Sequence, residues 1–301
     1  MTISNRDWLV EPFEEHRSHL RAVAYRMLGS LSEADDAVQE AWLRVSRADT
    51  SDVENLRAWL TTVVARVALN MLRSRKTRRE SSMDERLPDP VVGPETGTHP
   101  EHEALVSDSV GLALMVVLEK LTPAERLAFV LHDVFGMPFD EIAPIIERSP
   151  VAARQLASRA RRRVRGAPVP DSDLKAQRAV VDAFLAASRR GDFETLLNLL
   201  DPDVVIRVDG GAARPGLTRL IRGRAAVAAQ GGGFARFGGA VTPVLVNGTA
   251  GAVAWTRRGE PFAVGSCTVR HGRIVSMELL ADPERIRQLD LTFLEGEPPP
   301  A

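Results

Sequence analysis

The sequence has almost no cysteine and a single tyrosine, and these shortages exclude several classes of protein. The one cysteine, Cys267, rules out an intrachain disulfide framework and a cysteine-based zinc site, which agrees with a reducing cytoplasm. No apolar run approaches the roughly 20 residues that a membrane-spanning helix needs, and the N-terminus lacks the apolar segment of a signal peptide. A cytoplasmic protein without a membrane partner is therefore expected.

The net charge of −1 conceals an uneven distribution of charge. Residues 73–79 and 148–165 are rich in arginine, whereas the stretch between them, 80–103, is acidic and contains prolines. A single basic cluster would be interpreted as a solvated helix end. Two clusters, each closing a helical pattern, indicate two separate contacts with a polyanion such as nucleic acid.

Hydrophobic periodicity divides the 301 residues into four parts. Residues 8–80 predict one helical module, 81–104 a proline-containing linker without regular structure, and 105–166 a second helical module. Residues 173–295 predict an α+β domain, in which an amphipathic helix precedes short strands. These strands are expected near residues 204–208, 241–246, 253–256, 262–270 and 274–280.

Local motifs predict where several elements begin and turn. Thr122-Pro-Ala-Glu125 has the N-cap, the first-turn proline and the acidic residue of a capping box, and its helix is expected to run through Val134. Asn247-Gly248 and His271-Gly272 are hairpin signals, because both turn positions of a type I′ turn need a positive φ.

The second helical module contains a helix-turn-helix pattern, with a short helix, a turn at residues 147–149 and a second helix from Pro150. In this motif, the N-terminal residues of the second helix meet base edges in the major groove, while arginines further along contact phosphates. Few nearby acids balance the arginines, which argues against a plain three-helix bundle. The predicted contact residues are Ala152, Arg154, Gln155, Ser158, Arg159, Arg161 and Arg162.

Two polar stripes stand out in the first module. One is acidic and, on its spacing alone, would be interpreted as solvent-exposed surface; it contains Asp35, Asp36, Gln39 and Glu40. The other leads into the basic segment, and such a stripe with a nearby aromatic residue suits single-stranded nucleic acid. It contains Trp59, Thr62, Arg66, Asn70 and Arg73, although Trp59 equally suits a core position.

Residues 24–45 and 56–79 resemble region 2 of extracytoplasmic-function sigma factors, and residues 121–165 resemble region 4 of that family. The resemblance implies binding to core RNA polymerase through the acidic stripe and melting of the promoter −10 element through the second stripe. It also implies capture of an unpaired base by the loop 48–54, and reading of the −35 duplex by the helix from Pro150.

The C-terminal part resembles a SnoaL-like domain, which implies a cone-shaped α+β barrel of the NTF2-like type. Sigma factors with this fusion often carry three short motifs, which here occupy residues 86–90, 209–212 and 281–285, with Arg86 where a tryptophan is usual. The resemblance implies that the linker motif docks on the domain. The residues expected in this contact are Leu87, Pro88, Asp89, Pro90, Asp209, Gly210, Gly211, Asp282 and Pro283.

Two rival functions remain open on the sequence alone. A conventional helix-turn-helix regulator with a ligand-sensing domain would leave residues 24–79 unexplained. An isomerase-like enzyme would have Asp209 and His271 as candidate acid–base residues, but the only tyrosine, Tyr25, lies far away in the first module. The sequence therefore predicts an alternative sigma factor without enzymatic activity, cofactor or metal, whose C-terminal domain acts in cis. Binding of a small molecule by that domain is left open.

Overall fold

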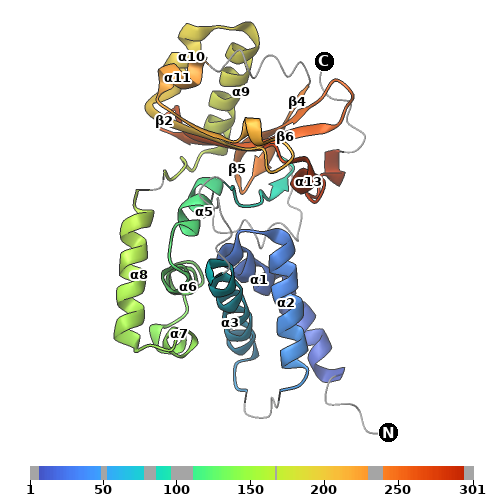
Figure 1. Cartoon of the computed structure of the whole chain (residues 1–301), viewed down its shortest axis with the longest axis vertical. Coiled ribbons are helices and arrows are strands. Elements are labelled where there is room, and N and C mark those ends of the chain that lie inside the picture. Colours follow the sequence, from blue (N-terminus) through green and yellow to red (C-terminus); the bar gives the residue numbers. More distant parts are fainter. Residues whose placement is uncertain are drawn as a thin grey trace. The chain divides into compact units, whose positions relative to one another are not determined.

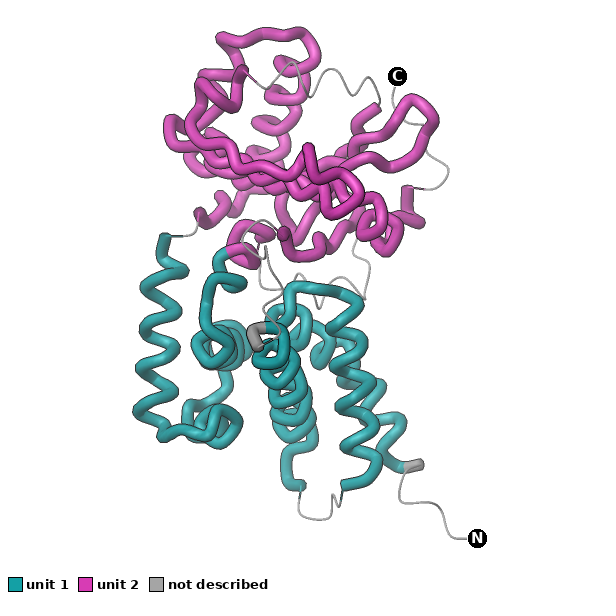
Figure 2. The backbone as a smooth tube through the Cα atoms, in the orientation of Figure 1, with its two compact units in different colours: residues 1–81, 117–166 teal, residues 82–116, 167–301 magenta. Residues whose placement is uncertain are grey.

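The structure is a computed structural model that describes residues 7–48, 53–77, 86–95, 111–166, 168–229 and 240–294. The chain forms two compact units (Figure 2), each built from two segments of sequence. The first unit comprises residues 1–81 and 117–166, and the second comprises residues 82–116 and 167–301. The linker and the start of the second helical module therefore belong with the C-terminal domain.

The first unit is entirely helical in its described residues (Figure 1). Its N-terminal part contains α1 (Asp7–Leu28), α2 (Leu31–Val45) and α3 (Leu56–Thr77), which pack on one another. Its second part contains α6 (Pro123–Phe129), a π-helical turn η1 (Val130–Val134), α7 (Phe139–Ile146) and α8 (Pro150–Val164). Helix α5 (Leu112–Glu119) precedes α6, and only its last turn belongs to this unit.

The predicted capping box is confirmed. The Thr122 side chain accepts a hydrogen bond from the backbone N–H of Glu125, and the Glu125 carboxylate accepts one from the backbone N–H of Thr122. The α-helix ends earlier than expected, at Phe129, because the backbone widens into the π-turn. There the N–H of Phe135 bonds the carbonyl of Val130, five residues back.

The second unit is a mixed seven-stranded sheet with helices on one face (Figure 1). The strand order is β1-β4-β5-β6-β7-β2-β3, and all neighbours are antiparallel except β2 and β7. The strands are β1 (Val92–Gly93), β2 (Leu200–Asp209), β3 (Arg219–Arg222), β4 (Val241–Val246), β5 (Thr249–Trp255), β6 (Pro261–Arg270) and β7 (Arg273–Leu280).

Helices α9 (Leu174–Arg190), α10 (Phe193–Leu199) and α11 (Arg224–Ala229) cover one face of this sheet, and Phe184, Leu196 and Met277 belong to the core between the layers. Short turns η2 (Pro215–Leu217), α13 (Pro283–Ile286) and η3 (Thr292–Leu294) complete the unit. This confirms an NTF2-like α+β domain. Within the described residues, the sheet is not closed into the barrel that the resemblance implied, since β1 and β3 are its edge strands.

The two hairpin signals are confirmed by the backbone. Asn247 and Gly248 have φ angles of 48° and 75° between β4 and β5, and His271 and Gly272 have 52° and 70° between β6 and β7. Two strands were not predicted. The β3 segment has no alternation of apolar and polar residues. The β1 segment lies in the linker, and its two residues form a strand only because they pair with β4.

A buried carboxylate, Glu278, lies on the sheet face opposite α9, since its β7 neighbours Met277 and Leu279 point toward the helices. It receives hydrogen bonds from Arg207, at 3.1 Å, and from Ser276, at 3.3 Å. Burial raises the pKa of Glu278 to about 7, against the lowering effect of Arg207. The folded protein therefore holds this proton at pH values where the unfolded chain releases it.

We expect the unfolding free energy to fall as pH rises between about 4.5 and 7, because the folded state binds more protons there. Glu278→Gln should remove this component, on the order of 2 kcal/mol between pH 5 and pH 8. Urea unfolding at the two pH values measures the difference. The exposed Glu194→Gln serves as control and should behave as the wild type; an unchanged pH dependence in Glu278→Gln would contradict the assignment.

Candidate functional site

The helix-turn-helix consists of α7, a turn at Glu147 and α8. Glu147 has a φ of 55° at the end of α7, in the left-handed region that glycine usually occupies. The Ser149 side chain then caps α8 by accepting a hydrogen bond from the backbone N–H of Ala152. Helix α8 buries Ala153, Ala157 and Ala160 against the unit. Of the predicted contact residues, Arg154, Gln155, Ser158, Arg159 and Arg162 are exposed, while Ala152 and Arg161 are half-buried.

Several arginines of α8 have acidic partners, contrary to the expectation from sequence. Arg161 donates to Asp133 at 2.6 Å, and Arg163 donates to Glu125 at 2.8 Å. Arg159 lies 3.6 Å from the same Glu125 carboxylate. These acids come from α6 and η1, about 30 residues earlier in the chain, so local composition did not reveal them. Arg162 is thus a better candidate for phosphate contact than Arg161.

Arg154 is held by an aromatic column. Its guanidinium lies 5.3 Å from the centre of the Phe139 ring, and Phe139 stacks on His132 with ring centres 3.8 Å apart. A guanidinium over an aromatic face is attracted by the ring quadrupole. The column therefore restrains Arg154 at the exposed N-terminal end of α8.

The acidic stripe on α2 is partly neutralised within the unit. Asp35 accepts two hydrogen bonds from Arg21, and Glu40 accepts one from Arg44 at 2.9 Å. Asp36 and Gln39 are exposed, and Leu43, one turn beyond Gln39, is exposed to 44%. The surface that remains for a partner is therefore centred on Asp36 and Gln39 and includes an apolar residue that sequence reasoning missed.

The second stripe runs along α3. Arg66, Asn70 and Arg73 are exposed at helical spacing, whereas Thr62 is half-buried and its hydroxyl donates to the carbonyl of Ala58 at 3.0 Å. Trp59 is also half-buried, so it is neither a fully buried core residue nor a free platform. The loop residues 49–52 and the basic residues 78–79 lie outside the described residues.

The two helical modules share a buried polar contact that the sequence did not indicate. Arg126 of α6 is 3% exposed, and its Nε donates to the carbonyl of Arg26 in α1 at 3.0 Å. Burial lowers the pKa of Arg126 to about 10. The Arg26 guanidinium in turn lies 5.3 Å from the Phe135 ring centre. Gly29 lies close to Arg126, because a Cβ on this glycine would be 3.4 Å from the Arg126 guanidinium and 2.6 Å from the Glu119 carboxylate.

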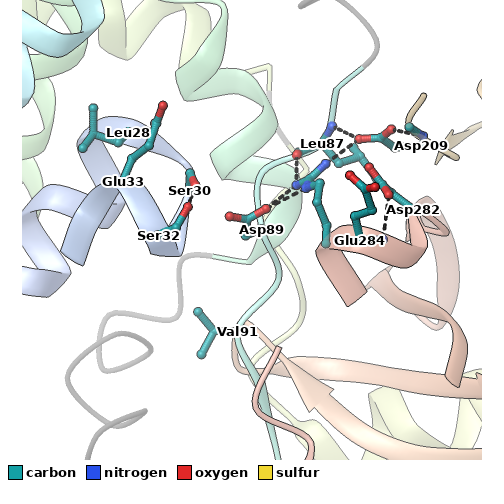
Figure 3. Close-up of polar contacts among 12 residues, drawn as sticks. Leu28, Ser30, Ser32, Glu33, Leu87, Asp89, Val91, Asp209, Asp282 and Glu284 are labelled. Carbon is teal, nitrogen blue, oxygen red and sulfur yellow. Dashed lines mark hydrogen bonds and ion pairs between the residues drawn. The ribbon is translucent and has the colours of Figure 1, made fainter. Parts of the chain in front are cut away.

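In the second unit, Arg285 of α13 is a buried group bonded to Leu87, Asp89 and Asp209, all three of which are labelled in Figure 3. Its Nε donates to Asp89 at 2.8 Å, its Nη1 donates to Asp209 at 2.7 Å, and its Nη2 donates to the Leu87 carbonyl. Asp209 also accepts a hydrogen bond from the backbone N–H of Leu87 at 2.8 Å. The three charged side chains are at most 10% exposed. One arginine thus joins the linker to the ends of β2 and β7.

The linker continues along the sheet as a strap, defined here as residues 87–95. Val91 exchanges two hydrogen bonds with Asn247, at 3.1 and 2.8 Å, and β1 then pairs with β4. Glu95 forms an ion pair with Arg178 of α9. The family resemblance placed Leu87, Asp89, Asp209 and the motif 281–285, which ends at Arg285, in this contact. It did not include Asn247 or Arg178, since no local pattern links residues more than 80 positions apart.

The glycines after Asp209 are required by close approach. A Cβ on Gly210 would be 2.2 Å from the Arg214 carbonyl, and one on Gly211 would be 2.0 Å from Asp282. The Gly211 backbone N–H donates to the other Asp209 oxygen at 3.0 Å, and Asp282 caps α13 by accepting from the N–H of Glu284. This turn therefore orients Asp209 toward the strap and sets α13 beside it.

An apolar cavity of about 100 Å³ lies between α9 and the sheet, with Phe184, Trp255, Cys267 and Met277 in its wall. Burial raises the pKa of the Cys267 thiol to about 12, which makes it unreactive. The two candidate acid–base residues, Asp209 and His271, do not line this cavity. Asp209 is bonded to Arg285 and Leu87, and His271 is exposed at the tip of the β6–β7 hairpin.

No group of three or more His, Cys, Asp or Glu side chains in the described residues has the arrangement of a metal site. None of the described helices is long and apolar enough to cross a membrane.

Comparison with known families matches three parts of the chain. Sigma-70 region 2 matches residues 12–78, Sigma-70 region 4 matches residues 111–164, and the SnoaL-like domain matches residues 181–278. The region 4 match begins just before α5, so its first helix starts in the part of the chain that belongs to the C-terminal unit.

Individual relatives agree with these matches. The ECF RNA polymerase sigma factor SigJ of Mycobacterium tuberculosis is 40% identical and covers 96% of both chains. The probable ECF RNA polymerase sigma factor SigI of the same species is 38% identical over 72% of this chain and 78% of its own. The crystal structure of M. tuberculosis SigJ superposes with a TM-score of 0.77, at 38% identity, over 94% of this chain and 99% of that one.

The strap should detach when its carboxylate is neutralised. We expect Asp89→Asn to increase hydrogen exchange of residues 87–93 roughly tenfold or more, because a hydrogen bond to a charged group stabilises by about 1.5–3 kcal/mol. Arg285 keeps Asp209 as its partner, so the domain itself should remain folded. In Asp89→Asn, exchange in α8 measured by mass spectrometry should equal that of the wild type. In the control Asp203→Asn, which changes an exposed carboxylate, exchange of the strap should also equal that of the wild type. Unchanged exchange of the strap in Asp89→Asn would contradict this bonding.

Proposed function

The chain belongs to the extracytoplasmic-function RNA polymerase sigma factors, and we propose which of its surfaces binds the polymerase and which bind promoter DNA. As an alternative sigma factor it binds core RNA polymerase and directs transcription initiation at promoters. Our proposal assigns core binding to α2, −10 recognition to α3 and −35 recognition to α8, with the SnoaL-like domain controlling the activity in cis.

The exposed part of α2 supports the assignment of core binding. Asp36 and Gln39 present an acidic-polar surface beside the exposed Leu43, a combination that suits a protein partner with a basic, partly apolar face. Asp35 and Glu40 contribute less, because Arg21 and Arg44 already neutralise them.

Contacts with DNA fall to two separate helices. Along α3, Arg66, Asn70 and Arg73 form an exposed basic-polar row suited to a melted −10 strand, with Thr62 and Trp59 at its half-buried end. At α8, we assign the exposed Arg154, Gln155 and Ser158 to −35 base edges and the exposed Arg162 to phosphate. Arg159 and Arg161 would reach phosphate only by leaving Glu125 and Asp133.

Control in cis rests on a single observation, the buried Arg285 that bonds both the strap and the C-terminal domain. The strap is part of the only covalent connection between the region 2 and region 4 segments. Holding it on the domain shortens the free length of this connection and limits the separations that the two DNA-binding segments can adopt. The SnoaL-like domain would thereby influence which promoters the protein can engage.

We also infer that the domain has no catalytic role. Asp209 is bonded in the strap contact, His271 is at an exposed hairpin tip, and the Cys267 thiol is held protonated. The cavity wall is mostly apolar, with Ser188, Arg189 and Ser266 as its polar members, and it suits a small, largely apolar molecule.

Run-off transcription with purified core polymerase tests the central assignment. We expect promoter-specific transcript that depends on the protein, and Asp36→Lys should weaken core binding roughly tenfold or more by placing like charge at the interface. Glu15→Lys makes the same charge change on the exposed surface of α1 and should leave binding unchanged. Transcript without dependence on the protein would contradict the proposed function, and equal binding by both variants would contradict the α2 surface.

A further inference from the structure

Helix α8 exposes a large apolar side chain where base edges are expected. Val151 is 60% exposed and is the second residue of the helix, directly after Pro150. Exposed apolar residues are common on protein surfaces, so exposure alone indicates no function. The position of Val151 relative to the other exposed residues of α8 gives it a specific role.

Val151 begins the exposed stripe of α8. At 3.6 residues per turn, Gln155, Ser158 and Arg162 follow it on nearly the same line along the helix. The opposite face is anchored by Ala153, Ala157 and Ala160, which are fully buried and fix the rotation of the helix. Val151 therefore points the same way as the residues assigned to DNA.

The end of the helix is suited to close approach by DNA. The first turn of α8 contains no acidic residue, although acids are favoured at helix N-termini, and the exposed carboxylate of Glu147 lies in the turn before the cap. Arg154 is held to one side over the Phe139 ring. Val151 is the large apolar side chain that α8 exposes beside it.

We propose that Val151 is a specificity-determining residue that contacts the 5-methyl group of a thymine in the −35 element. In the major groove, thymine alone presents a methyl group, and apolar side chains at the tip of a recognition helix distinguish it by contact. This role rests on the proposed function, because it requires α8 to lie in the −35 major groove. It adds a thymine preference beside the base that Arg154 reads.

The size of the effect follows from the area of one methyl group. Excluding a methyl from water stabilises by about 0.8 kcal/mol, so its removal should weaken binding about fourfold. Deoxyuridine provides the probe, since it differs from thymidine only in lacking this methyl and keeps the same base pairing.

The experiment uses the full chain with core polymerase and a promoter fragment selected from a library randomised over the −35 segment. Each −35 thymine on either strand is replaced singly by deoxyuridine, and the dissociation constant is measured. For the wild type, one replacement should weaken binding about fourfold. For Val151→Ala, the replacement at that position should have no effect, and Val151→Ile should retain the discrimination.

Val169→Ala serves as the matched control, because Val169 is 72% exposed but lies beyond the end of α8. It should behave as the wild type at every position. The proposal is overturned if no thymine position distinguishes wild type from Val151→Ala, or if Val169→Ala loses the same discrimination. Failure of every protein to bind promoter DNA with core polymerase would instead refute the proposed function itself, which separates the two conclusions.

Discussion

The second unit depends on one buried arginine shared by two carboxylates from distant parts of the chain. Arg285 bonds Asp89 of the strap and Asp209 at the end of β2, and all three side chains are nearly excluded from water. Such a cluster adds little net stability compared with apolar residues, whereas each hydrogen bond to a charged group within it stabilises by about 1.5–3 kcal/mol. Its contribution is therefore positional: only one docking register of the strap satisfies all three charges.

Turn chemistry prepares the site that receives the strap. The two glycines after Asp209 allow a close turn that α13 can approach, and Asn247 occupies the left-handed region at a hairpin where its side chain meets Val91. A further contact lies beyond the strap, where Gly111 lies against Thr249 of β5. The SnoaL-like domain thus contacts the connection between the two sigma regions at points more than 15 residues apart. A change in the conformation of the domain would therefore change how far this connection can extend.

Sequence reasoning succeeded where a local pattern determines the structure. The capping box at Thr122, the two hairpin turns and the helix-turn-helix follow from neighbouring residues and were predicted. It failed where pairing depends on the fold. Asp133 and Glu125 meet α8 arginines only after α6 and α8 pack, and Arg178 pairs with Glu95 across 83 residues. The strand β1 exists only because β4 offers a free edge, and the π-turn at Val130 has no signal in composition. Motif resemblance indicated the part of the strap contact formed by Leu87, Asp89, Asp209 and the segment that ends at Arg285, but not Asn247 or Arg178.

The central claim is that the docked strap controls the sigma activity in cis, and transcription by strap variants tests it most directly. Asp89→Asn and Asn247→Ala detach the strap through different contacts and touch neither α2, α3 nor α8. In run-off transcription with core polymerase across a set of promoters, the account predicts that both variants change activity in the same direction. It also predicts that the double variant adds little, because each change removes the same docked state. Activity equal to that of the wild type on every promoter, in variants whose strap is shown to be detached, would contradict the account.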